Sequence, residues 1–139
     1  MATITKLTAT IGSGQPLSNV VDLGGRFLVG IIMPTGWTTA HVSVLVSLDS
    51  TNFYDLFSFQ SGVSTSPAEF AFNVRPNAIV AVNPDAMLMA RYIRLRSGTR
   101  DAPVVQTEAR VFGVITVNAV TVQALPAEMR NETDSDESV

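Results

Sequence analysis

The sequence predicts an all-β protein, built as an antiparallel β-sandwich of about eight to ten strands. Three observations lead to this fold class. Apolar and polar residues alternate in short runs, turn residues recur about every eight to twelve positions, and helical periodicity is almost absent. The chain of 139 residues is long enough for one domain that buries roughly 68% of its unfolded surface. We expect a β-sandwich domain over residues 1–118 and an extended C-terminal arm over residues 119–139.

A hairpin over residues 36–59 forms the centre of the predicted fold. Residues 41–49 alternate strictly, as in a half-buried strand. The side chains on one face of that strand are Val42, Val44, Val46 and Leu48. The Asp-Ser-Thr-Asn sequence at residues 49–52 bonds readily to its own backbone and favours a chain reversal. Residues 53–59 then predict an aromatic partner strand.

Three strands are expected before this hairpin. Residues 3–11 alternate, residues 20–23 form a short strand, and residues 27–33 are apolar on both faces. A strand that is apolar on both faces lies in the middle of a sheet or beneath a second layer. The first strand places Leu7, Ala9 and Ile11 on one face; the third places Phe27, Val29, Ile31 and Met33 on one face and Leu28 and Ile32 on the other.

Four further strands are expected after the hairpin, around residues 69–73, 79–82, 91–97 and 104–118. A single helical turn over residues 84–89 separates the middle two, since proline and aspartate suit a first turn. Within residues 91–97, the side chains of Ile93 and Leu95 point inward, and those of Tyr92, Arg94 and Arg96 point together to the other side. In the last strand, the residues that share one face are Val111, Gly113, Ile115 and Val117.

Composition excludes several kinds of site. The chain has no cysteine and one histidine, which removes disulfides, thiolate chemistry and multi-histidine metal centres. No apolar run approaches the ~20 residues of a membrane helix, and the N-terminus has no signal-peptide pattern, so the chain reads as soluble and unsecreted. Residues 1–127 hold eight basic and seven acidic side chains, whereas residues 128–139 have a net charge of −4. A surface so poor in charge predicts that much of it is covered by a partner.

Two candidate polar sites have simpler explanations. Asp49, Asn52 and Asp55 gather three oxygen ligands around one turn, as calcium requires, but a calcium ion takes six to eight ligands. An ordinary hairpin turn is the preferred interpretation. His41 could serve a hydrolytic triad, yet no nucleophile-elbow sequence surrounds any serine. No catalytic residue, metal site or cofactor is therefore predicted.

The basic residues concentrate at Arg91, Arg94, Arg96 and Arg100, with Tyr92 among them. Phosphate or nucleic-acid binding is one interpretation, but a near-neutral body would make too few phosphate contacts for duplex binding. A row of arginines suits bidentate carboxylates, so an interface is the preferred interpretation. The carboxylates could come from an acidic patch on another protein, or from a neighbouring copy's tail through Glu128, Glu132, Asp134 and Asp136.

Three aromatic side chains also admit two interpretations. Trp37, Tyr54 and Tyr92 could stack on sugar rings at one end of the sandwich. Packing in the core or in a protein interface is the preferred role. Sugar binding requires the three to be exposed and clustered, whereas an assembly role requires them to be packed.

Two resemblances to known families follow from these motifs. The sequence VSLDSTNFYDL at residues 46–56, followed by RYIRLRSG at residues 91–98, resembles the discoidin-type jelly-roll sandwiches, which include carbohydrate-binding modules. A longer resemblance, over residues 13–115, is to small virion proteins of tailed bacteriophages. Its motifs are turn and strand signatures and lie at residues 13–24, 31–38, 46–49, 91–99 and 102–106.

The resemblance implies a jelly-roll-like, non-enzymatic virion structural protein. We expect a capsid decoration or cement protein that works as a homo-oligomer and binds the major capsid protein, without nucleic acid or membrane as partner. It would be made in the cytoplasm of the bacterial host and would reside on the capsid exterior or the tail. A tail or head-to-tail connector component is one alternative, and a carbohydrate-binding module for host attachment is the other.

Overall fold

The computed structural model describes residues 3–58 and 66–119 of the chain. These residues form eleven strands and one 3₁₀ turn, η1 (Pro84–Met87). The strands are β1 (Ile4–Ile11), β2 (Val21–Asp22), β3 (Phe27–Ile32), β4 (Val42–Ser47), β5 (Tyr54–Asp55), β6 (Phe57–Ser58), β7 (Ala68–Glu69), β8 (Ala71–Phe72), β9 (Ile79–Ala81), β10 (Tyr92–Ser97) and β11 (Arg110–Val117).

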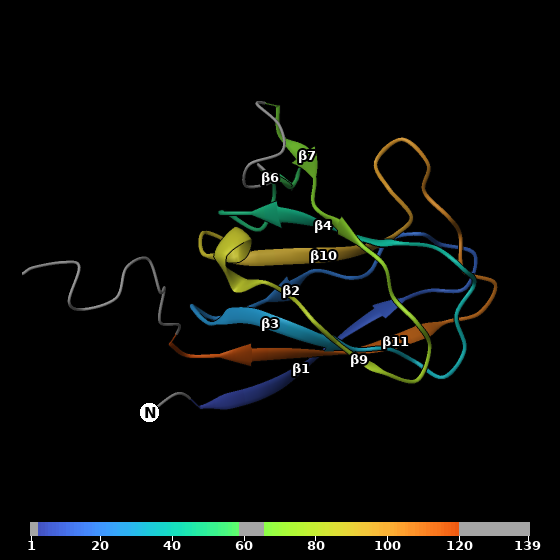
Figure 1. The fold of residues 1–139 in the computed structure, drawn as a ribbon, viewed down its shortest axis with the longest axis horizontal. Helices are drawn as coiled ribbons and strands as arrows, with labels where there is room; N and C mark the ends of the chain where they lie inside the picture. The colour runs from blue at the N-terminus through green and yellow to red at the C-terminus, as the bar shows by residue number, and fades with distance from the viewer. Residues whose placement is uncertain (1–2, 59–65, 120–139) are drawn as a thin grey trace, which may run out of the picture.

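Two antiparallel sheets pack face to face, one above the other in Figure 1. The first sheet has the order β1-β11-β3-β9, and the second has the order β2-β10-β4-β5, with β8 also paired to β4. The chain alternates between the sheets from β1 to β4 and again from β9 to β11, so its first and last strands become neighbours. This is a jelly-roll arrangement. The predicted all-β antiparallel sandwich is confirmed.

The core lies between the two sheets and is almost entirely aliphatic. Its largest fully buried apolar side chains are Phe112, Ile11, Leu23, Leu28, Ile31, Met87, Ile93 and Leu95. Burying each such side chain stabilises the fold by about 1.5 to 3 kcal/mol. The predicted inward direction of Ile93 and Leu95 is confirmed, because both are completely buried.

A β-bulge changes the expected faces of β3. The pairing of β11 with β3 runs from Ile115 opposite Gly30 to Thr116 opposite Leu28, which leaves Val29 as an extra residue. A bulge of this kind reverses the alternation on one side of it. Leu28 therefore shares the core with Ile31, and the prediction that these two residues face opposite ways is wrong. The prediction that this strand lies inside a sheet is confirmed.

The central hairpin forms, with two differences from expectation. β4 pairs with β5 through Val46 opposite Tyr54, but β4 is buried on both faces and is not half-buried. Its outward serines, Ser43 and Ser47, are also buried. Ser43 Oγ accepts a hydrogen bond from Arg96 and donates one to the Gly98 carbonyl, and Ser47 Oγ donates one to the Asp49 carboxylate. The strand ends at Ser47, so Leu48 is 71% exposed and does not join the core.

Most of the remaining elements follow the sequence patterns, but the strand predicted over residues 104–118 begins only at Arg110, because residues 104–109 form a loop. The aromatic partner strand is divided into β5 and β6, and Phe59 lies outside the described residues. The predicted helical turn is η1, begun by Asn83, whose Oδ1 accepts a hydrogen bond from the Asp85 amide. Among the described residues, no helix is long and apolar enough to cross a membrane.

Gln106 is buried and ties the loops after β1 and β3 to strands β10 and β11. Its Nε2 donates to the Thr38 carbonyl at 3.0 Å and to Ser97 Oγ at 2.7 Å. Its Oε1 accepts from the Thr38 amide at 2.9 Å and from Arg110 Nε at 3.0 Å. The backbone of Gln106 also bonds to Gly14 and Gln15 in the loop after β1.

Replacing Gln106 by leucine is expected to lower the free energy of unfolding by about 2 to 3 kcal/mol, because buried polar groups then lose their partners. A glutamate at position 106 keeps the acceptor for Thr38 and Arg110, but it donates neither to Ser97 nor to the Thr38 carbonyl and buries a carboxylate against that carbonyl, so its loss should be at least as large. Urea denaturation measures both changes. A leucine variant as stable as the wild type would show that water replaces the amide.

Candidate interaction surfaces

Arg96 is the centre of a charged network on the second sheet. Its guanidinium contacts the Asp55 carboxylate at 2.6 Å and the Glu69 carboxylate at 2.7 Å, and its side chain is 10% exposed. The contact between Arg96 and Asp55 Oδ1 is an ion pair that lacks hydrogen-bond geometry. Arg96 Nε instead donates a hydrogen bond to Ser43 Oγ at 2.9 Å. Since carboxylates from β5 and β7 cover it, Arg96 does not belong to an exposed arginine row, and that expectation is wrong.

Two other arginines of the predicted row, Arg91 and Arg100, remain accessible. Arg91 is half exposed, and its Nε donates a hydrogen bond to Asp22 Oδ1 at 3.0 Å. This bond from Arg91, and to a smaller extent the bond from the Gly24 amide, lowers the pKa of the Asp22 carboxyl below its ordinary value. Arg100 is mostly exposed, 3.5 Å from Asp55. Their role in an interface stays a prediction.

Arg94 is partly buried on the same sheet. Its Nε donates to the Ser18 carbonyl at 2.7 Å, and its guanidinium lies 5.9 Å from the centre of the Phe53 ring. Tyr92, on the same strand, is covered on one side by Arg91 at 5.2 Å. The acidic partners suggested for these residues, Glu128, Glu132, Asp134 and Asp136, lie outside the described residues.

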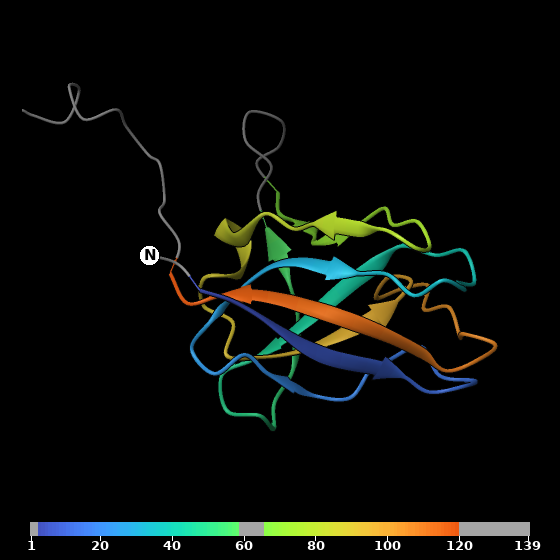
Figure 2. The same cartoon turned by 90° about the horizontal axis from the view of Figure 1, so that it is seen from below.

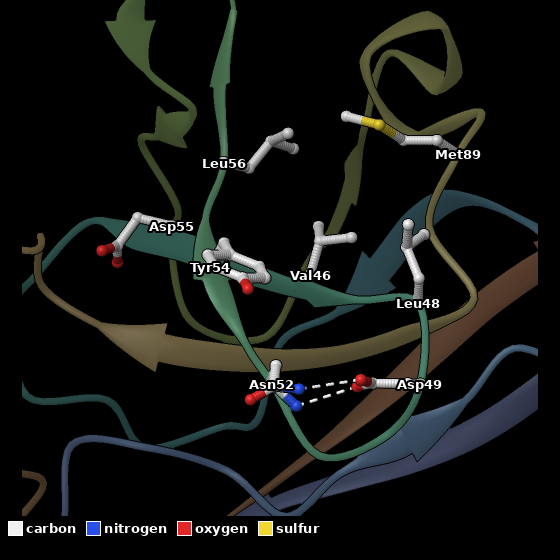
Figure 3. Close-up of a pocket in the computed structure, with 8 residues that line it drawn as sticks. All are labelled: Val46, Leu48, Asp49, Asn52, Tyr54, Asp55, Leu56 and Met89. Atoms are coloured by element: carbon white, nitrogen blue, oxygen red, sulfur yellow. Dashed lines mark hydrogen bonds between the residues drawn. The ribbon is translucent and has the colours of Figure 1, made fainter.

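The polar turn after β4 is closed on itself. Asp49 accepts hydrogen bonds from the amides of Thr51 and Asn52 and from the side chains of Asn52 and Ser47, and these bonds hold the pKa of the Asp49 carboxyl well below its ordinary value. Asp55 points away from this pair (Figure 3), and its carboxylate contacts Arg96 and Arg100. The described residues contain no group of three metal-ligating side chains.

The three candidate aromatic residues do not share a surface. Trp37 precedes β4 and packs edge-on against Phe112, with ring centres 5.4 Å apart, while its Nε1 donates to the Ala40 carbonyl. Tyr54 and Tyr92 instead pair with Val46 and Ser47 at the far end of β4. Because Val46 and Ser47 are consecutive, the two tyrosines lie on opposite faces of the sheet.

An apolar hollow of about 300 Å³ lies beside the β4–β5 turn (Figure 3). It is lined by Val46, Leu48, Asp49, Asn52, Tyr54, Asp55, Leu56 and Met89. Leu48, Tyr54 and Met89 are 71%, 70% and 64% exposed, so solvent covers apolar surface here. No sequence pattern predicted the hollow, because Met89 follows η1 and meets the hairpin only in the folded chain.

The outer face of the first sheet is a second apolar surface, viewed from its outer side in Figure 2. Residues paired across β1, β11, β3 and β9 share this face, and the core residues Ala9 and Phe112 point the other way. The predicted shared face of β11 is this outer face. Its members are Ile4, Lys6, Thr8 and Thr10 on β1, Val111, Gly113, Ile115 and Val117 on β11, Phe27, Gly30 and Ile32 on β3, and Ile79 and Ala81 on β9.

Comparison with known proteins assigns no family: no protein-family model, no curated protein and no solved structure matches the chain. The surfaces described above therefore provide the basis for a functional proposal.

Proposed function

We propose that this chain is a non-enzymatic structural protein of a tailed-bacteriophage virion, most simply a capsid decoration protein that binds the major capsid protein and acts as a homo-oligomer. One observation carries the proposal: a small domain exposes two separate apolar surfaces, the hollow beside η1 and the outer face of the first sheet. A decoration protein needs two such contacts, one with the lattice and one with its own copies.

The energetics of such a role follow from these surfaces. Covering apolar surface yields roughly 25 cal/mol per Å², and the exposed Leu48, Tyr54 and Met89 offer that surface around one concave site. A protein that binds only the assembled lattice stabilises it against disassembly by mass action. Residues 119–139, which follow the last strand, would reach over neighbouring subunits.

Two alternatives differ in the partner. A tail or connector component would use the same surfaces on another virion protein. A carbohydrate-binding module would need its aromatic residues on one platform, and the three candidate aromatic residues do not share one. The packing of Trp37 against Phe112 supports the assembly role, whereas Tyr54, which is 70% exposed, does not meet the packing that this role requires.

Co-sedimentation with capsids that lack this protein tests the proposal. We expect saturable binding that raises the capsid's melting temperature, and weaker binding after truncation at Leu125. The double variant Leu48→Lys/Met89→Lys should weaken binding at least tenfold, since it places two charges in the hollow. The control, Val20→Lys/Val105→Lys, makes the same charge change at apolar residues that are 40% and 54% exposed away from both surfaces. If neither the full chain nor the truncation bound capsids, the capsid role would be excluded.

A further inference from the structure

The outer face of the first sheet is apolar on β11, β3 and β9, whereas β1 contributes Ile4 together with the polar residues Lys6, Thr8 and Thr10. Val117 lies between Ile4 and Phe27, and the next rows contain Ile115 and Ile32. Ile79 on the edge strand β9 is 67% exposed, and Val111 on β11 is 56% exposed. Lys6 is the one charged side chain among the residues of this face, and no carboxylate is among them.

Two glycines make this face flat. A Cβ atom at Gly113 would lie 2.9 Å from Cδ1 of Ile32, so the isoleucine side chain extends across the glycine. In the next row, a Cβ atom at Gly30 would lie 3.7 Å from Cδ1 of Ile115. Branched side chains lying over glycines fill the depressions between the strands, and a filled sheet face suits another sheet as its partner.

The size of the face fits a specific protein interface. β1 and β11 have eight residues each, β3 has six and β9 has three, so with strands about 4.8 Å apart the face covers at most roughly 500 Å². Two such faces in contact would bury at most about 1,000 Å², the lower limit for a specific interface and the size expected of a weak dimer.

We propose that a second copy of this chain occupies the face, so that two first sheets pack against each other around a two-fold axis. The absence of carboxylates favours a copy over a charged partner, because an apolar face is complementary to itself. This inference deepens the assembly role proposed above and rests on it for its biological meaning. Its test requires no capsid.

Lys6 selects the orientation of the two copies. A two-fold axis across the strands would place β1 over β1 and bring the two Lys6 ammonium groups together. An axis along the strands places β1 of one copy over β9 of the other, which separates the two charges by about three strand spacings, or ~15 Å, beyond the screening length. Because the row of Lys6 continues through Ile115 and Gly30 to Ala81, the stem of Lys6 then packs over the partner's Ala81, with its ammonium group at the rim.

Sedimentation velocity of the full chain, over a wide range of protein concentrations, tests the dimer. We expect a species of twice the 14.9 kDa chain mass. The variant Ile79→Lys/Val111→Lys should raise the dimer dissociation constant at least tenfold. Circular dichroism should show an unchanged fold, since both side chains are more than half exposed.

Two matched variants separate this inference from the capsid role. Leu48→Lys/Met89→Lys and Val20→Lys/Val105→Lys carry the same charge change and should remain dimeric. A chain that stays monomeric at every concentration, or an Ile79→Lys/Val111→Lys variant that associates like the wild type, would overturn the inference. A dimer that binds no capsid keeps the inference and removes the proposed function; a monomer that binds capsids does the reverse.

Discussion

Replacing Arg96 by methionine is expected to lower the free energy of unfolding by about 3 to 5 kcal/mol. Removing one partner of a buried ion pair leaves the remaining charges uncompensated in a poorly solvated place. Here the groups that lose their main partner are the carboxylates of Asp55 and Glu69, whose side chains are 22% and 18% exposed. Among the described residues, they keep only Arg100 Nε at 3.5 Å and the Arg100 amide at 2.8 Å, respectively. Because Ser43 also loses its bond from Arg96, the link between β4, β5, β7 and β10 weakens at one point. Urea denaturation followed by circular dichroism measures the change.

Arg100→Met is the matched control for this prediction. Arg100 reaches the same Asp55 carboxylate at 3.5 Å but is 59% exposed, so its loss should cost less than about 1 kcal/mol. The triple variant Arg96→Met/Asp55→Asn/Glu69→Gln should recover part of the stability, since it removes the uncompensated charges together with the cation. Equal effects of the two single arginine variants would mean that burial does not govern this network.

The fold could be predicted because strand geometry has a period of two. That period assigned Ile93 and Leu95 to the core, and β4 paired with β5 around the polar turn as expected. The bulge at Val29 was not predictable, since an extra residue is recognised only from its pairing with β11. Alternation also could not tell the inner face of β11 from the outer face, because both carry valines or isoleucines.

The candidate surfaces were harder to predict than the fold. Arg96 looked like a surface residue because its partner Glu69 is 27 positions away in the chain and reaches it only through the β6–β7 hairpin. Trp37 gave no sign of whether it would be exposed, and its packing depends on Phe112 at the other end of the sequence. The apolar hollow depends on Met89 meeting the central hairpin. Contacts of this kind arise from tertiary structure and leave no local pattern.

Gly98 lies where β10 enters the loop that returns at Pro103, and the structure admits no side chain at this position. Its φ is +92°, and a Cβ atom would meet the Ala102 carbonyl oxygen, with the Val104 nitrogen at 2.7 Å and the Pro103 Cα at 2.9 Å. All three are backbone atoms, so no side chain can turn away to make room. The loop is also fixed by bonds from the Gly98 amide to the His41 carbonyl and from the Val104 amide to the Ser97 carbonyl.

Gly98→Ala should therefore lower the free energy of unfolding by about 4 kcal/mol, with ~1 kcal/mol from the positive φ and about 3 kcal/mol from overpacking. Gly25→Ala separates the two contributions, because Gly25 has a φ of +80° and no heavy atom within 4 Å of a Cβ. Its loss should be about 1 kcal/mol, measured by the same urea denaturation. If both alanines cost the same, the 98–103 loop moves aside and only backbone strain remains. A threefold or larger difference means that β10, the loop and the β3–β4 connection are held as one rigid unit.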